Sequence, residues 1–345
     1  MAMFSRKAIN RSGEILVSNN VNSQEYESAL QMLNDWRALH LVPLNTFQAT
    51  LRSYVKSVAG RNSIVAQRLK RVPTILDKMQ NRQQQMQLGR MQDVGGLRAI
   101  VASNELVRKI ERKYDRSRTK HHLERKSDYI AVPKASGYRG IHIVYKYSSP
   151  EKPDYDGLFI EIQLRTKLQH LWATAVETVD FFFLESLKYS QGADDWQKFF
   201  KLVSAIFALM ENEQPHTDFQ AMTKEQLIAQ LLEFDRDKHL VSRLETIKVA
   251  SFAKKDSQLS KAAYWVIETT LNGHSSIKVH PFLESQKDSA DLTYRQLEQS
   301  SDRKIGKKQV VLISVDSVSK IEKAYPNFFG DIEEFLKTIQ RIAQQ

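Results

Sequence analysis

The stretch LFIEIQLR, from Leu158 to Arg165, alternates apolar and polar side chains and predicts a strand with two unlike faces. Successive residues of a β-strand point to opposite sides of the sheet, so every second side chain shares a face. One face is wholly apolar and consists of Leu158, Ile160, Ile162 and Leu164. The other face carries Phe159 and three polar side chains, Glu161, Gln163 and Arg165. We therefore expect a sheet that buries one face and offers the other to a ligand.

Two further short strands extend this pattern. DVGGLRAIVA, residues 93–102, has a Gly-Gly turn before an apolar run in which Arg98 faces away from its neighbours. IHIVYKY, residues 141–147, places His142 on the side opposite its isoleucines. Helical spacing is expected over residues 22–59 with a break at 41–43, and over 63–87, 105–114 and 167–188, while the basic stretch 116–126 is expected to be a loop or a helix end. Strands separated by helices predict an α+β or α/β sheet layered with helices.

Composition indicates a globular protein with room for two domains. The 345 residues carry a net charge of +11 and contain no cysteine, which excludes disulfides and thiolate catalysis. Residues 1–190 contain 30 Lys/Arg against 18 Asp/Glu, whereas residues 191–345 contain 21 against 22. Such an excess suits a region that handles phosphates, although a solvated basic surface is the alternative. With no apolar run long enough for a signal or a membrane span, we expect a cytoplasmic protein without a membrane partner.

The second half of the chain predicts a separate module. A small polar break, YSQGADD at residues 189–195, marks the boundary. Beyond it the spacing predicts helices over 196–212, 223–244 and 331–342, and strands over 263–270, 276–280 and 309–315. The aromatic cluster YPNFF at residues 325–329 is interpreted as core packing at a helix entry. This region is therefore expected to be a small α+β domain.

Several common catalytic motifs are absent, and what remains points to phosphate chemistry. The sequence has no GxxxxGK[ST], GxGxxG, HExxH or GxSxG pattern. Glu161 and Asp93 instead offer two carboxylates among Arg, His and Gln side chains, a set that can bind Mg²⁺ beside nucleotide phosphates. A solvent-exposed sheet face with weak ion pairs is the alternative reading of the same residues.

Three motifs in order, DVGGLRAIV, DYIAVPKASGYRGIHIVY and EIQLRTKLQHLWATAVE, resemble the synthetase domain of RelA/SpoT proteins over roughly residues 45–185. This family includes small alarmone synthetases and toxic relatives, among them fused toxin–antitoxin chains of the CapRel type. The resemblance implies an N-terminal helical segment (1–44), a nucleotidyltransferase-like mixed sheet flanked by helices (45–190) and a smaller regulatory, antitoxin-like α+β domain (191–345). It also implies Mg²⁺-dependent transfer of the β,γ-pyrophosphate of ATP to a ribose 3′-hydroxyl.

The family pattern assigns a role to each matching position. Asp93 would bind Mg²⁺, and Glu161 would bind metal or act as the base, with Gln163 helping to position the acceptor. The side chains assigned to ATP are Arg68, Lys70, Lys78 and Arg98. Those assigned to the acceptor are Lys134, Ser136, Tyr138, His142 and Arg165. The resemblance thus predicts that the ring of Tyr138, flanked by glycine at Gly137, stacks on the acceptor base.

The match departs from the family after the EIQ strand, which leaves the acceptor open. Alarmone-making members usually read WA(T/S)xEH there, whereas this chain reads WATAVETVD with Val176 before Glu177. Gln169 and His170 occupy a position near which an Asn often contacts the guanine nucleotide. The expected acceptor is the tRNA 3′ CCA end, modified by a toxin whose C-terminal domain binds a protein trigger such as a phage protein. The alternatives are GDP or GTP as acceptors of an alarmone synthetase, or a catalytically inactive nucleotide- or RNA-binding module.

Overall fold

The computed structural model describes residues 5–18, 22–60, 63–82, 86–187, 192–245, 262–272, 274–302, 308–314 and 328–344. Its contacts divide the chain into two compact units. The first unit comprises Met1–Val132 and Arg139–Lys167, and the second comprises Pro133–Tyr138 and Leu168–Gln345. Each unit has its own hydrophobic core.

Three helices open the first unit: α1 (Arg6–Val17), α2 (Ser23–Leu39) and α3 (Leu41–Ala59). The side chain of Asn22 caps α2 by accepting a hydrogen bond from the backbone N–H of Glu25 at 2.9 Å. The expected break between α2 and α3 is confirmed and lies at His40, just before Pro43 in the first turn of α3. Helices α1 and α2 pack through a common apolar cluster that includes Ile9, Leu33 and Trp36.

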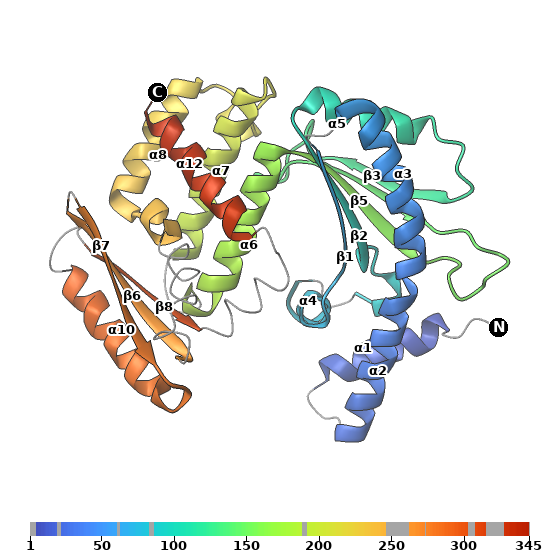
Figure 1. Ribbon diagram of the computed structural model, residues 1–345, viewed down its shortest axis with the longest axis horizontal. Helices are drawn as coiled ribbons and strands as arrows, with labels where there is room; N and C mark the ends of the chain where they lie inside the picture. Colours follow the sequence, from blue (N-terminus) through green and yellow to red (C-terminus); the bar gives the residue numbers. More distant parts are fainter. Residues whose placement is uncertain are drawn as a thin grey trace. The chain divides into compact units, whose positions relative to one another are not determined.

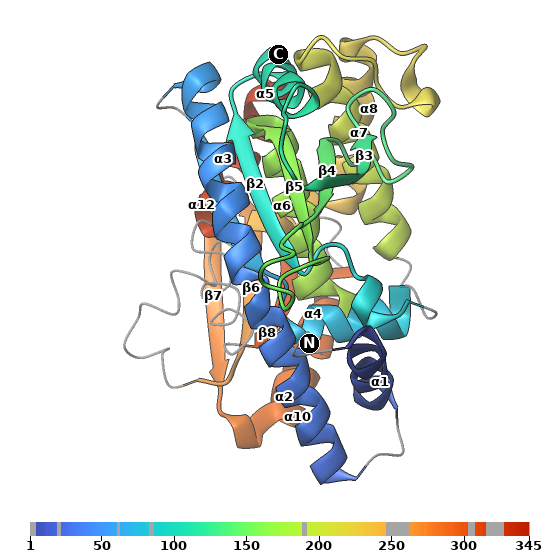
Figure 2. The ribbon, with the colours of Figure 1, turned by 90° about the vertical axis from the view of Figure 1, so that its right-hand side faces the viewer.

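The first unit is built on a five-stranded sheet in the order β1-β2-β5-β4-β3. The strands are β1 (Ile64–Leu69), β2 (Gly95–Val101), β3 (His122–Asp128), β4 (Ile141–Lys146) and β5 (Phe159–Thr166). Strands β2 and β5 run parallel, and the other pairs are antiparallel. Helix α3 and helix α5 (Asn104–Asp115) pack on one face of the sheet (Figures 1 and 2). The expected mixed sheet flanked by helices is therefore confirmed.

The apolar alternation in β5 fills the core beneath these helices. Ile160, Ile162 and Leu164 are completely buried and join Leu44 and Leu51 of α3 in one cluster. Packing of this kind is the main favourable contribution to folding, because each fully buried aliphatic side chain contributes roughly 1.5–3 kcal/mol. The apolar face inferred from LFIEIQLR is thus the core-facing side of the sheet.

The prediction of one helix over residues 63–87 is wrong. This segment forms β1, a short helix α4 (Val72–Asp77) and a π-helical turn η1 (Lys78–Arg82), followed by the 3₁₀ turn η2 (Leu88–Arg90). The backbone of β1 pairs with β2 along its whole length, and this tertiary pairing outweighs a weak helical pattern. Pro73 lies in the first turn of α4, where a missing N–H costs nothing, so it starts a helix and does not interrupt one.

The basic stretch 116–126, expected to be a loop or a helix end, also contains the start of a strand. Strand β3 begins at His122 and pairs antiparallel with β4, with a register shift between Leu123 and Arg125. Its side chains are mostly exposed, so it lacks the apolar alternation by which a strand is recognised in sequence.

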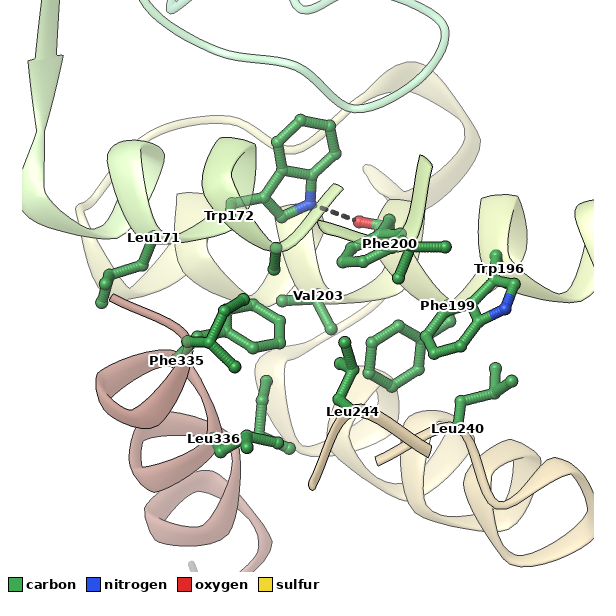
Figure 3. Close-up of a cluster of buried hydrophobic side chains, with 14 of the residues drawn as sticks. Leu171, Trp172, Trp196, Phe199, Phe200, Val203, Leu240, Leu244, Phe335 and Leu336 are labelled. Carbon is green, nitrogen blue, oxygen red and sulfur yellow. Dashed lines mark hydrogen bonds between the residues drawn. The ribbon is translucent and has the colours of Figure 1, made fainter. Parts of the chain in front are cut away.

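The second unit contains four packed helices: α6 (Lys167–Leu187), α7 (Gly192–Met210), α8 (Lys224–Lys238) and α12 (Phe328–Ala343). Trp172 of α6 lies against Phe200 of α7 and donates a hydrogen bond from Nε1 to the Phe200 carbonyl at 2.8 Å (Figure 3). Phe335 of α12 packs into the same cluster (Figure 3). Helix α6 contributes its apolar side chains here, and by its contacts the chain belongs to the second compact unit from Leu168 onward.

The second unit also has a three-stranded antiparallel sheet in the order β7-β6-β8. Its strands are β6 (Tyr264–Asn272), β7 (His274–Phe282) and β8 (Lys308–Ser314), and they match the three strands expected from the sequence. Helix α10 (Lys287–Asp302) packs beside them (Figure 1). The second unit also contains two 3₁₀ turns, η3 (Thr217–Phe219) and η4 (Glu284–Gln286), and residues 240–245 are helical. The C-terminal region is therefore α+β, while YPNFF falls largely outside the described residues, with α12 beginning at Phe328. In the described part of the chain, no helix combines the length and the apolar character needed to cross a bilayer.

Gly137 provides a test of how the loop 133–138 is held in the second unit. Its φ is +93°, and a Cβ at this position would lie 3.0 Å from the Cβ of Ser204. Gly60 has a φ of +65° with open space around it, so Gly60→Ala serves as a control for backbone strain alone. We expect Gly60→Ala to cost about 1–3 kcal/mol, and Gly137→Ala to cost more because Ser204 must also move. Thermal unfolding followed by circular dichroism measures both, and an equal loss in the two variants would contradict the close packing at Gly137.

Candidate active site

The polar face of the sheet is organised in rows that run across the strands. Directly paired residues on neighbouring strands point to the same side of a sheet. One row joins Arg98 of β2 to Gln163 of β5, His142 of β4 and Ser127 of β3. The next row joins Arg68 of β1 to Gly96, Glu161, Val144 and Arg125. The strand parity inferred from the sequence is therefore confirmed, and it gathers the expected polar side chains on one face.

Glu161 lies at the centre of this face, and both of its carboxylate oxygens are hydrogen bonded. His142 Nδ1 lies 2.8 Å from Oε1, and Gln163 Nε2 donates to Oε2 at 2.7 Å. Arg165 in turn donates from a guanidinium nitrogen to the Gln163 side-chain oxygen at 2.8 Å. Since an ionised carboxylate only accepts hydrogen bonds, the proton of this contact lies on His142 Nδ1. The four side chains form one chain that fixes the orientation of Glu161.

This environment keeps Glu161 ionised although it is buried. Burial raises the pKa of the carboxyl, but the hydrogen bond and charge of His142, the hydrogen bond from Gln163 and the charge of Arg165 outweigh it and lower the pKa to about 2. Only 8% of the residue is exposed, so these contacts replace water as its source of stabilisation. A buried, oriented negative charge is available at this point of the sheet at neutral pH.

A second cluster lies just before β2 and centres on Asp93. Lys70 Nζ lies 2.9 Å from one of its oxygens, and Lys78 Nζ lies 2.9 Å from the other. Burial raises the pKa of Asp93, and the charges and hydrogen bonds of the two lysines lower it further than burial raises it. Lys70 directly follows β1, where its N–H donates to the Val94 carbonyl at 2.7 Å, and Lys78 opens the π-helical turn η1. Three residues that the family pattern assigns to ATP and metal are thus in direct contact with one another.

Arg68 and Arg98 lie on the same sheet face. Arg68 is exposed near the end of edge strand β1 and pairs with Gly96, while Arg98 is half-buried and pairs with Ala66 on one side and Gln163 on the other. The strand register therefore places Arg68 in the same row as Glu161, and Arg98 in the same row as Gln163.

The loop expected to receive the acceptor belongs to the second unit by its contacts. Lys134 Nζ lies 5.1 Å from the centre of the Tyr138 ring, and that ring is 6.3 Å from Trp172 in an edge-on arrangement. Ser204 Oγ donates to the Gly137 carbonyl at 2.5 Å. Tyr138 is accordingly half-buried against α6 and α7, whereas Ser136 is exposed. The structure groups Lys134, Ser136 and Tyr138 with the second unit, and Asp93, Glu161 and His142 with the first.

The family-implied magnesium is compatible with these carboxylates. No group of three or more His, Cys, Asp or Glu that could hold a metal occurs among the residues described. Mg²⁺, however, is commonly held by one or two carboxylates together with substrate phosphates. Asp93 and Glu161 are ionised, and Glu161 pairs with Gly96, three residues after Asp93. The donor set therefore fits an ion shared with a nucleotide and not a closed protein site.

Arg125 on β3 is a site-face residue that the sequence did not identify. It lies in the same row as Glu161, but the strand that carries it was expected to be a loop. A single apolar residue, Leu123, was the only strand signal in HLERKSD, and it is exposed at 44%. The pairing of β3 with β4 places Arg125 on this face, and the local sequence contains no pattern from which that position could be predicted.

Residues 67–180 match the family described as the region found in RelA / SpoT proteins, which confirms the resemblance carried by the three motifs. The GTP pyrophosphokinase YjbM of Bacillus subtilis (strain 168) is 30% identical over 118 residues. That alignment covers 34% of this chain and 56% of the relative, so the chain spans little more than half the length of this curated relative.

Two solved structures are also similar. Small alarmone synthetase 1 from Bacillus subtilis, bound to its product pppGpp, is 21% identical with a TM-score of 0.45, over 53% of this chain and 94% of that one. A GTP pyrophosphokinase family protein from Streptococcus pneumoniae is 24% identical with a TM-score of 0.39, over 49% of this chain and 85% of that one.

The low pKa of Glu161 predicts a pH-dependent contribution to stability. The folded pKa of about 2 lies below the ordinary value of 4.5, so the stabilisation is complete above pH 4.5 and is lost as the pH falls toward 2. At about 1.36 kcal/mol per pKa unit, the full contribution is on the order of 3 kcal/mol. Glu161→Gln cannot titrate, so the difference in unfolding free energy between wild type and variant should shrink between pH 4.5 and 2. Urea unfolding at several pH values measures this difference, and a constant value across that range would refute the assignment.

Proposed function

We propose that this chain, whose residues 67–180 match the RelA/SpoT family, is an ATP-dependent pyrophosphokinase that transfers the β,γ-pyrophosphate of ATP to a ribose 3′-hydroxyl. The observation that carries the proposal is the ionised Glu161, buried between His142 and Gln163 on a sheet face that also presents Arg68 and Arg98. The name of the relative YjbM, a GTP pyrophosphokinase, supports the same reaction class.

In the proposed reaction the acceptor 3′-oxygen attacks the β-phosphorus of ATP. A new phosphorus–oxygen bond forms, the bond between the β-phosphorus and the oxygen bridging to the α-phosphate breaks, AMP leaves, and the proton of the acceptor hydroxyl is released to water. Enzymes assist such a transfer mainly by positioning and by neutralising developing negative charge. Mg²⁺ bound by Asp93 and Glu161 would supply part of this charge neutralisation, and Arg68, Lys70, Lys78 and Arg98 would supply the rest.

The lowered pKa of Glu161 limits the role that this carboxylate can have in the reaction. A general base is most effective when its pKa lies near the working pH. With its pKa lowered to about 2 by His142 and Gln163, Glu161 is better suited to binding a cation and orienting the acceptor hydroxyl than to removing its proton. His142 and Gln163 are then positioning residues for this carboxylate, and Arg165 positions Gln163.

The contacts of Asp93 suggest how ATP is received. Lys70 and Lys78 both pair with Asp93. A triphosphate offers both lysines stronger partners, and their transfer to it releases Asp93 for the metal that accompanies ATP. Binding of nucleotide and binding of metal are therefore coupled through the same three side chains.

For the acceptor we favour the tRNA 3′ CCA end, which would make the protein a translation-inhibiting toxin with a regulatory second unit that binds a protein trigger. The charge supports a large anionic acceptor, because residues 1–190 carry 30 Lys/Arg against 18 Asp/Glu. GDP or GTP is the second candidate acceptor, and the name of YjbM favours it. An inactive binding module is the third, although the presence of Asp93, Arg98 and Glu161 argues against it.

The three candidates differ in one assay. The full-length protein is incubated with γ-labelled ATP and Mg²⁺, together with either deacylated tRNA or GDP and GTP. Label in tRNA supports the first candidate, and label in a guanosine product supports the second. No label in either, tested with the full chain and with a truncation after about Leu187, supports the third.

Glu161→Gln should abolish transfer while leaving the fold intact. The amide preserves shape but removes the charge that orients the acceptor and binds the cation, so we expect turnover to fall at least about 100-fold. Glu105→Gln, which neutralises an exposed carboxylate on α5, is the matched control and should retain activity. Initial rates with labelled ATP measure both variants, and wild-type turnover in Glu161→Gln would refute the proposed role.

Tyr138→Ala tests whether the loop 133–138 receives the acceptor. Base stacking on an aromatic ring contributes about 1–3 kcal/mol, so the KM for the acceptor should rise roughly 5- to 150-fold while ATP binding changes little. Trp172→Phe is the companion variant. It changes the side chain against which Tyr138 packs and leaves the Tyr138 ring in place. Equal losses of acceptor and ATP affinity in Tyr138→Ala, with a lower Tm, would instead indicate a structural role.

A further inference from the structure

We propose that the exposed edge of the sheet beside β3 binds the phosphodiester backbone of an RNA acceptor. The surface, called here the β3-edge basic surface, consists of Arg112, Arg116, Arg118, Lys120 and Arg125. It comprises the end of α5, the connection after it and the middle of β3. The inference rests on the proposed pyrophosphate transfer to RNA and adds the residues that bind the RNA backbone and the side from which the acceptor approaches.

The charge of this surface is not neutralised within the protein. Residues 112–125 contain six Lys/Arg against two Asp/Glu. Most carboxylates of this region pair with other cations: Asp128 with Arg108, Glu105 with Lys109, and both Glu111 and Asp115 with Lys126. Glu124 on β3 is exposed and offsets one positive charge of the surface. All five members of the β3-edge basic surface are exposed, and none of them forms an ion pair or a side-chain hydrogen bond within the part of the chain that the structure describes. The surface therefore keeps its positive charge for a partner.

The register places one member of this surface, Arg125, on the face of the candidate active site, whereas its neighbour Lys126 points to the opposite face and pairs with Glu111 and Asp115 of α5. Arg125 pairs with Val144, which pairs with Glu161, so the three side chains point to the same face. Neighbouring strands lie about 4.8 Å apart, which places Arg125 roughly 10 Å from Glu161 across the sheet. Arg68 lies two strands away on the opposite side, in the same row. If Arg68 faces ATP, the β3-edge basic surface lies on the side from which the acceptor enters.

Protection of a sheet edge does not account for this concentration of charge. Charged side chains on edge strands prevent unwanted pairing with other chains. The other edge of the same sheet, β1, carries Arg68 as its single cation and exposes Ile64, Ala66 and Gln67. Strand β3 itself carries Arg125 and Lys126, whereas Arg116, Arg118 and Lys120 lie in the connection before it and not on an edge strand, so edge protection does not account for them.

The distribution of the cations favours a polynucleotide over a mononucleotide. Arg125 lies on β3, and the other four lie between residues 112 and 120, at the end of α5 and in the connection after it. A nucleic-acid strand carries a phosphate at every nucleotide, so it can offer separate phosphates to cations on different elements. GDP or GTP carries its phosphates at one point and would leave most of these cations without a partner.

The test compares two full-length variants that lose the same charge. The surface variant carries Arg116→Gln, Arg118→Gln, Lys120→Gln and Arg125→Gln. The control variant carries Lys7→Gln, Arg11→Gln, Arg52→Gln and Lys56→Gln, four exposed cations of α1 and α3. Fluorescence anisotropy with labelled deacylated tRNA gives the Kd of each protein at several salt concentrations, and thermal unfolding checks that both variants fold.

We expect the surface variant to bind tRNA at least 10-fold more weakly than wild type, and the control variant to stay within about twofold. The slope of log K against log salt should decrease in magnitude by roughly 0.7–0.9 for each phosphate contact removed. Transfer of label to tRNA should fall in parallel, while transfer to GDP or GTP, if present, should not change.

Three results would overturn the inference: no tRNA binding by the wild type, equal weakening in both variants, or equal weakening of poly-glutamate and tRNA binding in the surface variant. The last result would indicate an acidic protein as the partner. Binding is measured without catalysis, so tRNA that binds at this surface but receives no pyrophosphate would contradict the proposed function alone. Transfer to tRNA that persists at full rate in the surface variant would contradict the location alone.

Discussion

The buried negative charge of Glu161 is the constraint on which the polar side of the sheet depends. A carboxylate with 8% exposure is stable only when hydrogen-bond donors replace water, and here His142 and Gln163 occupy both oxygens. Those donors come from β4 and β5, so the strands must keep their register for the charge to be tolerated. The same register sets Arg98, Arg68 and Arg125 around the carboxylate at intervals of one or two strands.

Asp93 is likewise a carboxylate kept ionised by neighbouring side chains, but its partners are of another kind. Its partners are the long side chains of Lys70 and Lys78, which bring their charge from outside the sheet. Glu161 is held by side chains of β4 and β5, whereas the lysines that hold Asp93 are the groups that would turn to phosphate in the proposed reaction.

The loop 133–138 lies between two strands of the first unit in sequence but belongs to the second unit by its contacts. Ser204 binds the Gly137 carbonyl, and Tyr138 packs toward Trp172, so a segment between β3 and β4 is held by the helices of the second unit. If this loop receives the acceptor, a partner that rearranges α6 or α7 changes acceptor binding directly. The second unit would then regulate acceptor binding through this loop itself.

The sequence by itself determined the strands β2, β4 and β5 and the polar face they share, because an alternation of period two is a local property of a half-buried strand. It also carried the resemblance to RelA/SpoT proteins, through three motifs in order, and residues 67–180 match that family. It could not determine β1 or β3, since edge strands with few apolar residues carry no such signal and exist through pairing with β2 and β4. Tertiary structure alone decided that Lys70 and Lys78 meet Asp93, that Arg125 joins the row of Glu161 and that Tyr138 packs with the second unit, because these contacts join residues distant in the chain.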